Sequence, residues 1–514
     1  MTGTKPFPEF IQEFRDQLAY LFHERSDIDA LSVTRGLPPF ILREIMSANP
    51  LATYIPRKYG GRGGSVKEGL ELASATAYES LPLSLAFGIN WALFLQPVAK
   101  YAQEGVKQGI FSDFLENRKM GGLMITEPGY GSDALHMISS YTQEQSSYHI
   151  KGLKHWAGLT GWADYWLLTA RRKNEDGSLG RAIDFFISDA SEPEQNIVVE
   201  EYYKNLGIYM LPYGRNRIDI KVPHSHKLEP QSTGLRMMLD LLHRSRMEFP
   251  GMATGFLQRM LDEAVTHCKE RQVGGRSLFS YDQVQQRLSR LQSAYTISSA
   301  MCLNSAGKAG IENDLSGIGL EANSVKTYVT DLMQSSAQSL LQLEGAKGYR
   351  LDHIAGRALV DSRPFQIFEG SNDILYIQIA EAVQKQMQRK KQHNLLQFLK
   401  TLELTQSAAG SRAAESTDAA GMQLSRLHKQ LDFELQLPLP QRKLTELGQI
   451  VSRIAAMSMV LTLGETGFNQ HLIDSSLLHI AQEVSGLLGS YHSAATTDYI
   501  EGYGESGSWF EAAR

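Results

Sequence analysis

The spacing of apolar residues changes twice along this chain of 514 residues, and that change limits the possible folds more than any other feature. Before about Met120, apolar residues recur at helical spacing. From Met120 to Val222 they fall in short β-rich runs separated by turn signals, with no helical stretch between the runs. Helical spacing returns from Gly234 to Gln392. Strands flanked by helices on both sides indicate that the strand region forms a domain of its own.

We predict an α+β fold that is mainly α and has four parts. Their bounds are 1–119 for an N-terminal helical domain, 120–232 for a central β-barrel or sandwich domain, 233–395 for a C-terminal four-helix bundle, and 396–514 for a linker with extra C-terminal helices. The linker is placed at Thr405–Gly421, which is rich in Ser, Ala and Gly, and amphipathic helices are expected at Leu444–Leu463 and Leu472–Leu488. The expected antiparallel strands are Gly122–Ile125, Tyr148–Leu153, Tyr165–Ala170, Ala182–Ile187, Asn196–Glu200 and Arg217–Val222.

Composition excludes several classes of protein. A net charge of -5 gives no reason to expect a nucleic-acid partner. The two cysteines, Cys268 and Cys302, have neither the spacing of a disulfide framework nor that of a metal site, so we expect no metal and a reducing compartment. Met1–Phe10 lacks the pattern of a signal peptide, and the expected location is therefore cytoplasmic. The apolar stretch Leu81–Val98 is of marginal length for a membrane span and is expected to be a buried helix.

Two strings beside predicted strands carry groups suited to a planar ligand. The loop at 126–133, with the sequence TEPGYGSD, combines backbone amides with the hydroxyls of Thr126 and Ser132, which can hold a polar heteroaromatic ring or a phosphate. A plain hairpin turn is the alternative. Farther along, Trp156 offers a flat apolar surface that could stack against a cofactor ring, or it is a core tryptophan.

A third string, QIFEGSND at 366–373, opens an apparent helix. Ser371 or Asn372 can cap that helix. Glu369 follows two apolar residues and precedes Gly370, where a substrate could approach the backbone closely. The alternative is a carboxylate placed to interact with the helix dipole.

Taken in order, these strings resemble the acyl-CoA dehydrogenase family. That family carries a Thr-Glu-Pro-x-x-Gly-Ser-Asp loop, a strand segment beginning with Trp, and a Tyr/Phe-Glu-Gly-Thr/Ser turn. The corresponding segments here are 126–133, 156–158 and 368–371, and further matches occur at 204–208, 271–278 and 342–349. The resemblance spans about Pro56 to Gln392.

The resemblance implies FAD as the cofactor, bound between the β domain and the C-terminal helical domain. The implied cofactor-binding residues are Thr126, Ser132, Trp156, Gly158, Arg271, Gln342, Gly345, Gly348, Ser371 and Asp373. Among these, Arg271, Gln342, Gly345 and Gly348 match positions that hold the diphosphate and adenine across a subunit interface, which implies a homodimer or homotetramer. The implied substrate-binding residues are Ser132, Arg246 and Gly370.

The same resemblance makes Glu369 the catalytic base. It would remove the α-proton of an acyl-CoA thioester while the β-hydrogen leaves as hydride to flavin N5, giving the trans-2-enoyl thioester. Electrons would then pass to an electron-transferring flavoprotein. Apolar surroundings would raise the pKa of the carboxyl towards the working pH. Glu248, close to Arg246 on the same predicted helix, is an alternative base.

Several positions depart from the family pattern. Gly158 stands where Thr or Ser is usual, which removes one side-chain contact to the flavin. Glu344 lies beside the diphosphate segment at a position that is usually uncharged. The other departures are His243, Gly274, Asp282 and Ala346.

Three other functions remain open on the sequence. The acyl group could be attached to a carrier protein in place of CoA. The missing hydroxyl at Gly158 also allows an oxidase or monooxygenase of the same fold. The third alternative is a non-catalytic scaffold that binds a flavin or an acyl group. The extension after Gln392 is similar to one in the very-long-chain branch, where it helps in dimer contacts and membrane association. The basic run at 385–391 before it either supports such association or favours the helix C-terminus.

Overall fold

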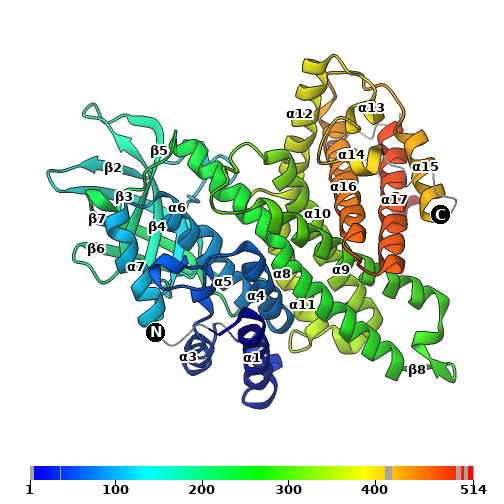
Figure 1. Ribbon diagram of the computed structural model, residues 1–514, viewed down its shortest axis with the longest axis horizontal. Helices are drawn as coiled ribbons and strands as arrows, with labels where there is room; N and C mark the ends of the chain where they lie inside the picture. Colours follow the sequence, from blue (N-terminus) through cyan, green and yellow to red (C-terminus); the bar gives the residue numbers. More distant parts are fainter. Residues whose placement is uncertain (1–4, 35, 411–418, 494–498, 503–507, 513–514) are drawn as a thin grey trace.

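The computed structural model describes residues 5–34, 36–410, 419–493, 499–502 and 508–512. Figure 1 shows the β-sheet on one side, the N-terminal helices below it, and a diagonal layer of long helices that ends in the C-terminal helices. The predicted fold class, mainly α with a central β element, is confirmed.

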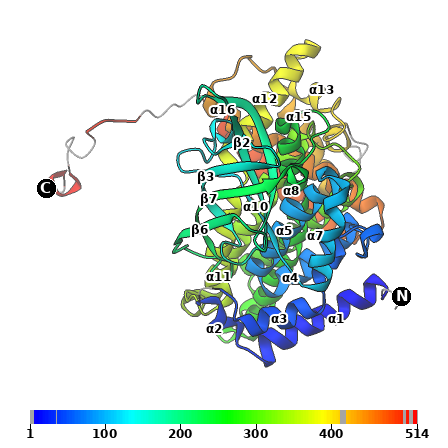
Figure 2. The same ribbon diagram turned by 90° about the vertical axis from the view of Figure 1, so that its left-hand side faces the viewer.

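The N-terminal helices form a layer against the long helix of the bundle. Their bounds are α1 Phe7–Ala19, α2 Ile28–Ser32, α3 Pro39–Ser47, α4 Val66–Glu79, α5 Leu81–Asn90, α6 Gln96–Tyr101 and α7 Glu104–Glu116, with shorter turns η1 Tyr20–Glu24, η2 Pro50–Tyr54, η3 Arg57–Tyr59 and η4 Trp91–Leu95. In α1, Phe10, Phe14 and Leu18 fall on one face and are buried, as their helical spacing predicts. Figure 2 shows α1, α2 and α3 at the base of the molecule, with α5 and α7 above them.

The central domain is a seven-stranded sheet with the order β1-β4-β2-β3-β7-β6, and β5 pairs with β4. Its strands are β1 Gly121–Met124, β2 Ser140–Gln143, β3 Ser147–Gly158, β4 Tyr165–Lys173, β5 Leu179–Asp189, β6 Gln195–Tyr202 and β7 Tyr213–Pro223. The expectation of purely antiparallel pairing was wrong for two pairs, because β1 and β2 run parallel to β4. β1 arrives from helix α7 and β2 from a long loop, and neither is joined to β4 by a hairpin.

The bundle is built around α8 Gly234–Glu270, one continuous helix that passes through Pro250. The remaining elements of this region are β8 Gln272–Val273, β9 Arg276–Ser277, η7 Leu278–Ser280, α9 Asp282–Lys308, α10 Gly319–Glu344, η8 Gly345–Gly348, α11 Ile354–Ser362, η9 Arg363–Gln366 and α12 Asn372–Lys390. Together, α8, α9, α10 and α12 enclose the apolar core of the C-terminal half.

The part of the C-terminal extension between Leu395 and His492 packs onto the bundle (Figure 1). Its helices are α13 Leu395–Leu399, α14 Gln406–Ala409, α15 Ala419–Leu431, α16 Gln441–Glu465, α17 Gln470–His492 and α18 Trp509–Ala512. The two long helices were predicted in place, and α16 lies against α9, α10 and α12. The predicted linker Thr405–Gly421 was wrong at both ends, which lie in α14 and α15, while residues 411–418 lie outside the described residues.

Two helical stretches of the described chain are long and apolar enough to cross a membrane, Leu81–Tyr101 and Gln441–Glu465. Other parts of the protein bury 89% and 78% of their respective apolar windows. Core helices of soluble proteins pass the same test, so these stretches are weak evidence for a membrane span. The prediction that Leu81–Val98 is a buried helix is confirmed.

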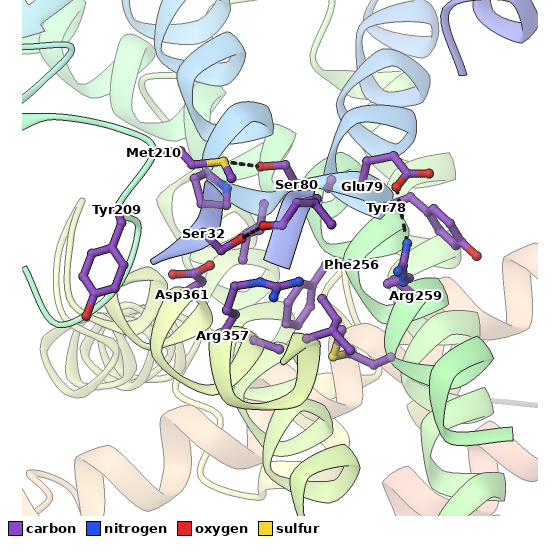
Figure 3. A pocket seen from close by; sticks show the side chains of 17 residues that line it. Ser32, Tyr78, Glu79, Ser80, Tyr209, Met210, Phe256, Arg259, Arg357 and Asp361 are labelled. Atoms are coloured by element: carbon purple, nitrogen blue, oxygen red, sulfur yellow. Dashed lines mark hydrogen bonds and ion pairs between the residues drawn. The ribbon is translucent and has the colours of Figure 1, made fainter. Parts of the chain in front are cut away.

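A small cavity of ≈ 30 Å³ lies where the N-terminal helices meet the bundle (Figure 3). There Arg357 of α11 pairs with Asp29 of α2 at 2.5 Å, and Asp361 accepts a hydrogen bond from the Ile208 amide. Burial raises the pKa of Asp361 to about 6. A space of this size holds about one or two water molecules. We interpret this space as part of the interface between the N-terminal helices and the bundle.

Candidate functional site

A cavity of ≈ 260 Å³ opens where the N-terminal helices, the sheet and the bundle meet. Seven of the predicted site residues line it, namely Thr126, Ser132, Trp156, Gly158, Arg246, Glu369 and Gly370. Three sequence strings, the first and last more than 200 residues apart, therefore converge on one space, as the family resemblance implies. Leu85, Ile89 and Leu93 supply its apolar wall from α5 and η4.

A buried ion pair supports the loop at 126–133. Glu127 lies 2.8 Å from the ammonium of Lys154 on β3, and its side chain also accepts hydrogen bonds from the amides of Ile138 and Ser139. Burial lowers the pKa of Lys154 to about 8, with Glu127 acting in the opposite direction. The glutamate of this motif thus faces the protein and anchors both ends of the loop, while Thr126 and Ser132 face the cavity.

Trp156 reaches the cavity because β3 is irregular at this point. The pairing of β3 with β7 shifts between Lys154 and Ala157, and Trp156 has a left-handed backbone with φ of 55°. Such bulges redirect a side chain next to functional sites. The indole is 53% exposed and lies on Tyr203, with the ring centroids 4.4 Å apart. This favours a ring-stacking surface over the alternative of a core tryptophan.

Glu369 lies in a turn whose backbone carbonyls are held by two buried cations. Arg246 on α8 donates to the Glu369 carbonyl at 2.7 and 3.1 Å, and Lys326 on α10 donates to the Gly370 carbonyl at 2.8 Å. Glu369 has φ of 54° and Gly370 φ of 90°, conformations that the surroundings must maintain. Burial lowers the pKa of Lys326 to about 7.

The carboxylate of Glu369 has one bonded and one free oxygen. Ser245 on α8 donates to its Oε1 at 2.8 Å, whereas the buried Oε2 has no hydrogen-bond partner. Burial raises the pKa of this carboxyl, and Arg246, Ser245 and Lys326 partly offset the rise. A buried carboxylate with a raised pKa and a free oxygen, on a residue that lines the cavity, is suited to accept a proton.

Glu248 is a second buried carboxyl close to this site. It lines a space of ≈ 20 Å³ together with Ser245 and Glu369, and Gln96 donates to its Oε1 at 2.7 Å. Burial raises its pKa to about 8, and the negative charge of Glu369 adds to the rise. It does not line the larger cavity, which makes Glu369 the better placed of the two candidate bases.

The raised pKa of Glu248 predicts a change of stability with pH. Its folded value of about 8 lies above the ordinary value of 4.5, so its protonated form stabilises the fold below pH 4.5 and this contribution is lost as the pH rises through about 8. Glu248→Gln removes the titration. Its stability relative to the unmodified protein is expected to rise between pH 5 and pH 8 by about 1.4 kcal/mol per pH unit.

Chemical denaturation at both pH values measures this difference. The matched control is Glu116→Gln, which changes an exposed glutamate at the end of α7 and is expected to show no such slope. Equal stability differences at pH 5 and pH 8 would show that Glu248 is not protonated in the folded protein.

Gly158 is buried and its missing side chain leaves no free space. A Cβ placed there would lie 2.6 Å from Ile89 Cδ1 and 3.2 Å from Tyr213 Cζ. The space that a Ser or Thr would fill is therefore occupied by these two side chains. The phenol of Tyr213 also faces the cavity, where burial and the charge of Glu369 raise its pKa.

The structure does not bring the remaining predicted residues to this cavity. Arg271, Gln342 and Gly345 are exposed near the far ends of α8 and α10, and Gly348 is buried in η8. In the same region, the unusual Glu344 is buried, with its carboxylate 2.9 Å from the ring of His267. It thus pairs within the chain.

Ser371 and Asp373 also lie outside the cavity, at the start of α12. Ser371 occupies the N-cap position but makes no side-chain cap bond. The Asn372 side chain bonds to Asp331 on α10 at 2.8 Å and to Thr330 at 3.0 Å. The capping hypothesis was therefore wrong for both residues, since Ser371 makes no cap bond and the Asn372 amide bonds to helix α10.

Sequence reasoning missed three residues of the site, Ser245, Lys326 and Tyr213. Lys326 occurs among small and polar residues on α10 and looks like a surface lysine in the sequence, yet it is fully buried. Only its contact with the distant Gly370 carbonyl reveals its role. No group of three or more His, Cys, Asp or Glu side chains in the described chain is arranged to hold a metal ion.

Comparison with known proteins identifies the family. Residues 122–219 match the model of the acyl-CoA dehydrogenase middle domain, and residues 232–384 match that of the acyl-CoA dehydrogenase C-terminal domain. The chain belongs to the acyl-CoA dehydrogenase family, an oxidoreductase family whose proteins bind FAD.

Individual relatives are distant. The very long-chain specific acyl-CoA dehydrogenase of mouse mitochondria is 22% identical over 378 residues, which is 72% of this chain but only 57% of the mouse protein. An acyl-CoA dehydrogenase of Bacillus anthracis, solved in complex with FAD, matches with a TM-score of 0.73 at 17% identity and covers 97% of this chain and 90% of its own. A prolyl acyl carrier protein oxidase matches with a TM-score of 0.66 at 16% identity, covering 74% of this chain and all of its own.

Proposed function

We propose that this protein is an FAD-dependent acyl-CoA dehydrogenase that uses Glu369 to remove the α-proton of the thioester and forms the trans-2-enoyl product. One observation carries the proposal: the unpaired, buried Oε2 of Glu369 belongs to a residue lining a cavity that Trp156 and the loop at 126–132 also line. Three groups that are distant in the sequence thereby supply a base, a flat aromatic surface and a polar loop in one space.

The residues present fit the ring end of FAD. The exposed face of Trp156 and the amides and hydroxyls of the loop at Thr126 and Ser132 would hold a flat, polar heteroaromatic ring at the cavity mouth. Bound FAD would accept the β-hydrogen as hydride. The residues predicted to hold the diphosphate and adenine lie elsewhere on the same chain, so the proposal includes a homodimer or homotetramer in which a second copy supplies them.

The chain's own groups account for the proton transfer. The Glu369 carboxylate accepts the α-proton at Oε2 while Ser245 holds Oε1 in place. Arg246 and Lys326 fix the turn through its carbonyls, and in this proposal the Glu369 amide would donate to the thioester carbonyl. A donor aimed at the oxygen of a developing enolate stabilises the transition state. Leu85, Ile89 and Leu93 exclude water from the acyl group.

Two alternatives stay open as proposals. The likeness to a prolyl acyl carrier protein oxidase supports an acyl group carried by a protein, or an enzyme that passes electrons to oxygen. The lack of a side-chain hydroxyl at Gly158 supports the alternative in which electrons pass to oxygen. Ile89 and Tyr213 fill the space where such a hydroxyl would lie. An electron-transferring flavoprotein is the proposed acceptor in the leading case.

The experiment is an anaerobic visible spectrum of the FAD-loaded protein before and after adding saturated acyl-CoAs of increasing length. We expect the flavin absorbance to bleach with at least one of them, since transfer of the β-hydrogen reduces the flavin. Bleaching only by the same acyl groups loaded on a carrier protein would favour the first alternative, and rapid recovery of colour in air the second. A flavin that none of these substrates bleaches would contradict the dehydrogenase proposal.

A further inference from the structure

The extension carries a buried arginine that faces the bundle. Arg453, in the middle of α16, is 8% exposed, and its guanidinium lies 4.3 Å from the ring centroid of Tyr328. Its Nη1 donates to the Tyr376 hydroxyl at 2.7 Å, and its Nη2 lies 3.2 Å from Asp331 Oδ2. Charge-assisted bonds of this kind are roughly twice as strong as neutral ones.

Asp331 in turn holds both sides of the turn that bears the base. We call residues 366–372 the base turn. Oδ1 of Asp331 accepts a hydrogen bond from Gln366 at 2.7 Å, before Glu369, and another from Asn372 at 2.8 Å, after it. Oδ2 accepts a bond from Tyr376 at 2.5 Å, one turn farther along α12. A single carboxylate therefore spans the base turn.

The network continues to the backbone beside the base. The Asn372 Oδ1 accepts a hydrogen bond from Lys326 at 2.9 Å, and the same ammonium donates to the Gly370 carbonyl at 2.8 Å. An unbroken series of polar contacts thus runs from Arg453 through Asp331, Asn372 and Lys326 to the residue after Glu369. It crosses from the extension to the active site through side chains of the interior.

We propose that Arg453 is a positioning residue for Glu369, and that the C-terminal extension thereby supports the active site. Arg453 fixes the carboxylate of Asp331, which fixes the two sides of the base turn and so the direction of the Glu369 side chain. The inference rests on the proposed function of Glu369, and it gives the extension a role that packing alone does not.

The conformation of the base turn explains why such support is needed. Glu369 and Gly370 both have left-handed backbones, which for a non-glycine residue is strained and persists only where surrounding contacts enforce it. Without the guanidinium, the charge on Asp331 loses its buried counter-charge, since Arg453 is the only cation paired with it in the described chain. The turn would then relax, and the base would lose its alignment.

The test compares Arg453→Met and Asp331→Asn with the double variant and with Arg453→Lys. We expect each single variant to lower kcat by about ten- to a hundredfold, the loss that a misplaced reacting group causes, with KM and FAD content little changed. The double variant should lose no more than the worse single one, because the two residues act in series. Arg453→Lys keeps the charge and should recover part of the loss.

A control separates this role from general loosening of the extension. Ser458, also buried on α16, accepts a hydrogen bond from the Ala408 amide at 3.0 Å, which ties α16 to α14 and not to the base turn. Ser458→Ala should destabilise the extension yet leave kcat within about twofold, since a buried amide without a partner lowers stability and does not touch the base turn. An equal loss of kcat in Ser458→Ala would overturn the proposal.

Hydrogen exchange of the peptide covering the base turn gives a measurement that needs no turnover. Arg453→Met should speed exchange at residues 366–372, and Ser458→Ala should not. If the unmodified protein fails to oxidise any substrate, the proposed function fails, but the exchange result still decides whether Arg453 holds the turn. Unchanged exchange together with unchanged kcat in Arg453→Met would overturn the inference.

Discussion

Replacing Glu369 with Gln is expected to lower kcat by about 10²–10⁴-fold, the contribution of a general base. The amide is nearly the same size as the carboxylate, so Arg246 can still hold the backbone carbonyl and Ser245 can still contact the side chain. What is lost is the basic, unpaired Oε2. Stopped-flow measurement of flavin bleaching isolates this step from later electron transfer.

The control for this variant is its bound flavin. Glu369→Gln should retain FAD with the ordinary visible spectrum, because Trp156 and the loop at 126–132 are unchanged. Ser245→Ala should give a much smaller loss of rate, since Ser245 only orients the carboxylate. A Glu369→Gln variant with full activity would exclude this residue as the base and direct attention to Glu248, the other buried carboxyl nearby.

The second large effect is expected on stability. Lys154→Met should lower the free energy of unfolding by about 3–5 kcal/mol, because it leaves the buried Glu127 without its counter-charge. Both side chains are almost completely buried, and their charged atoms are 2.8 Å apart. Since Glu127 also binds the amides of Ile138 and Ser139, the loop carrying Thr126 and Ser132 should loosen, and the affinity for FAD should fall with it.

Urea denaturation and FAD titration measure the two consequences. Lys151→Met is the matched control, because this lysine lies on the same strand, is 59% exposed in its side chain, and pairs with Asp219 at 3.3 Å. A surface pair contributes about 0–1 kcal/mol. Adding Glu127→Gln to Lys154→Met should restore part of the stability by removing the unpaired charge. A loss as small as that of Lys151→Met would show that Glu127 is stabilised by its amide contacts alone.

The order of elements could be predicted from the sequence for a physical reason, whereas only the family resemblance implied that the three strings meet at one site. Helical and alternating patterns record which side of an element is buried, and turn residues record where elements end. Strand β2 was not predicted because Ser140–Gln143 is short and mostly polar. The parallel pairing of β1 and β2 with β4 was not predicted either, since the direction of a strand depends on its neighbours and not on its own residues.

The supporting contacts of the site could not be predicted. Arg453 and Asp331 are 122 residues apart and belong to helices whose patterns show only that each has an apolar face. Lys326, Asn372 and Ser245 are ordinary helix residues until the partners that bury them are known. Glu344 is a case in which the sequence suggested a conflict that the structure removes. Its negative charge would repel the expected diphosphate, but its carboxylate lies beside His267 of the same chain.

The irregularity in β3 limits how this site can change during evolution. Side chains of a strand alternate between its two faces, and a one-residue shift moves every later side chain to the opposite face. The site therefore depends on the number of residues between Lys154 and Ala157 as much as on their identity. Deleting His155 would restore regular pairing and place the indole opposite Arg215, on the face away from the buried Lys154 and Asn216. Substitutions elsewhere in the strand can accumulate gradually, whereas a change of length here would remove the flat surface in a single step.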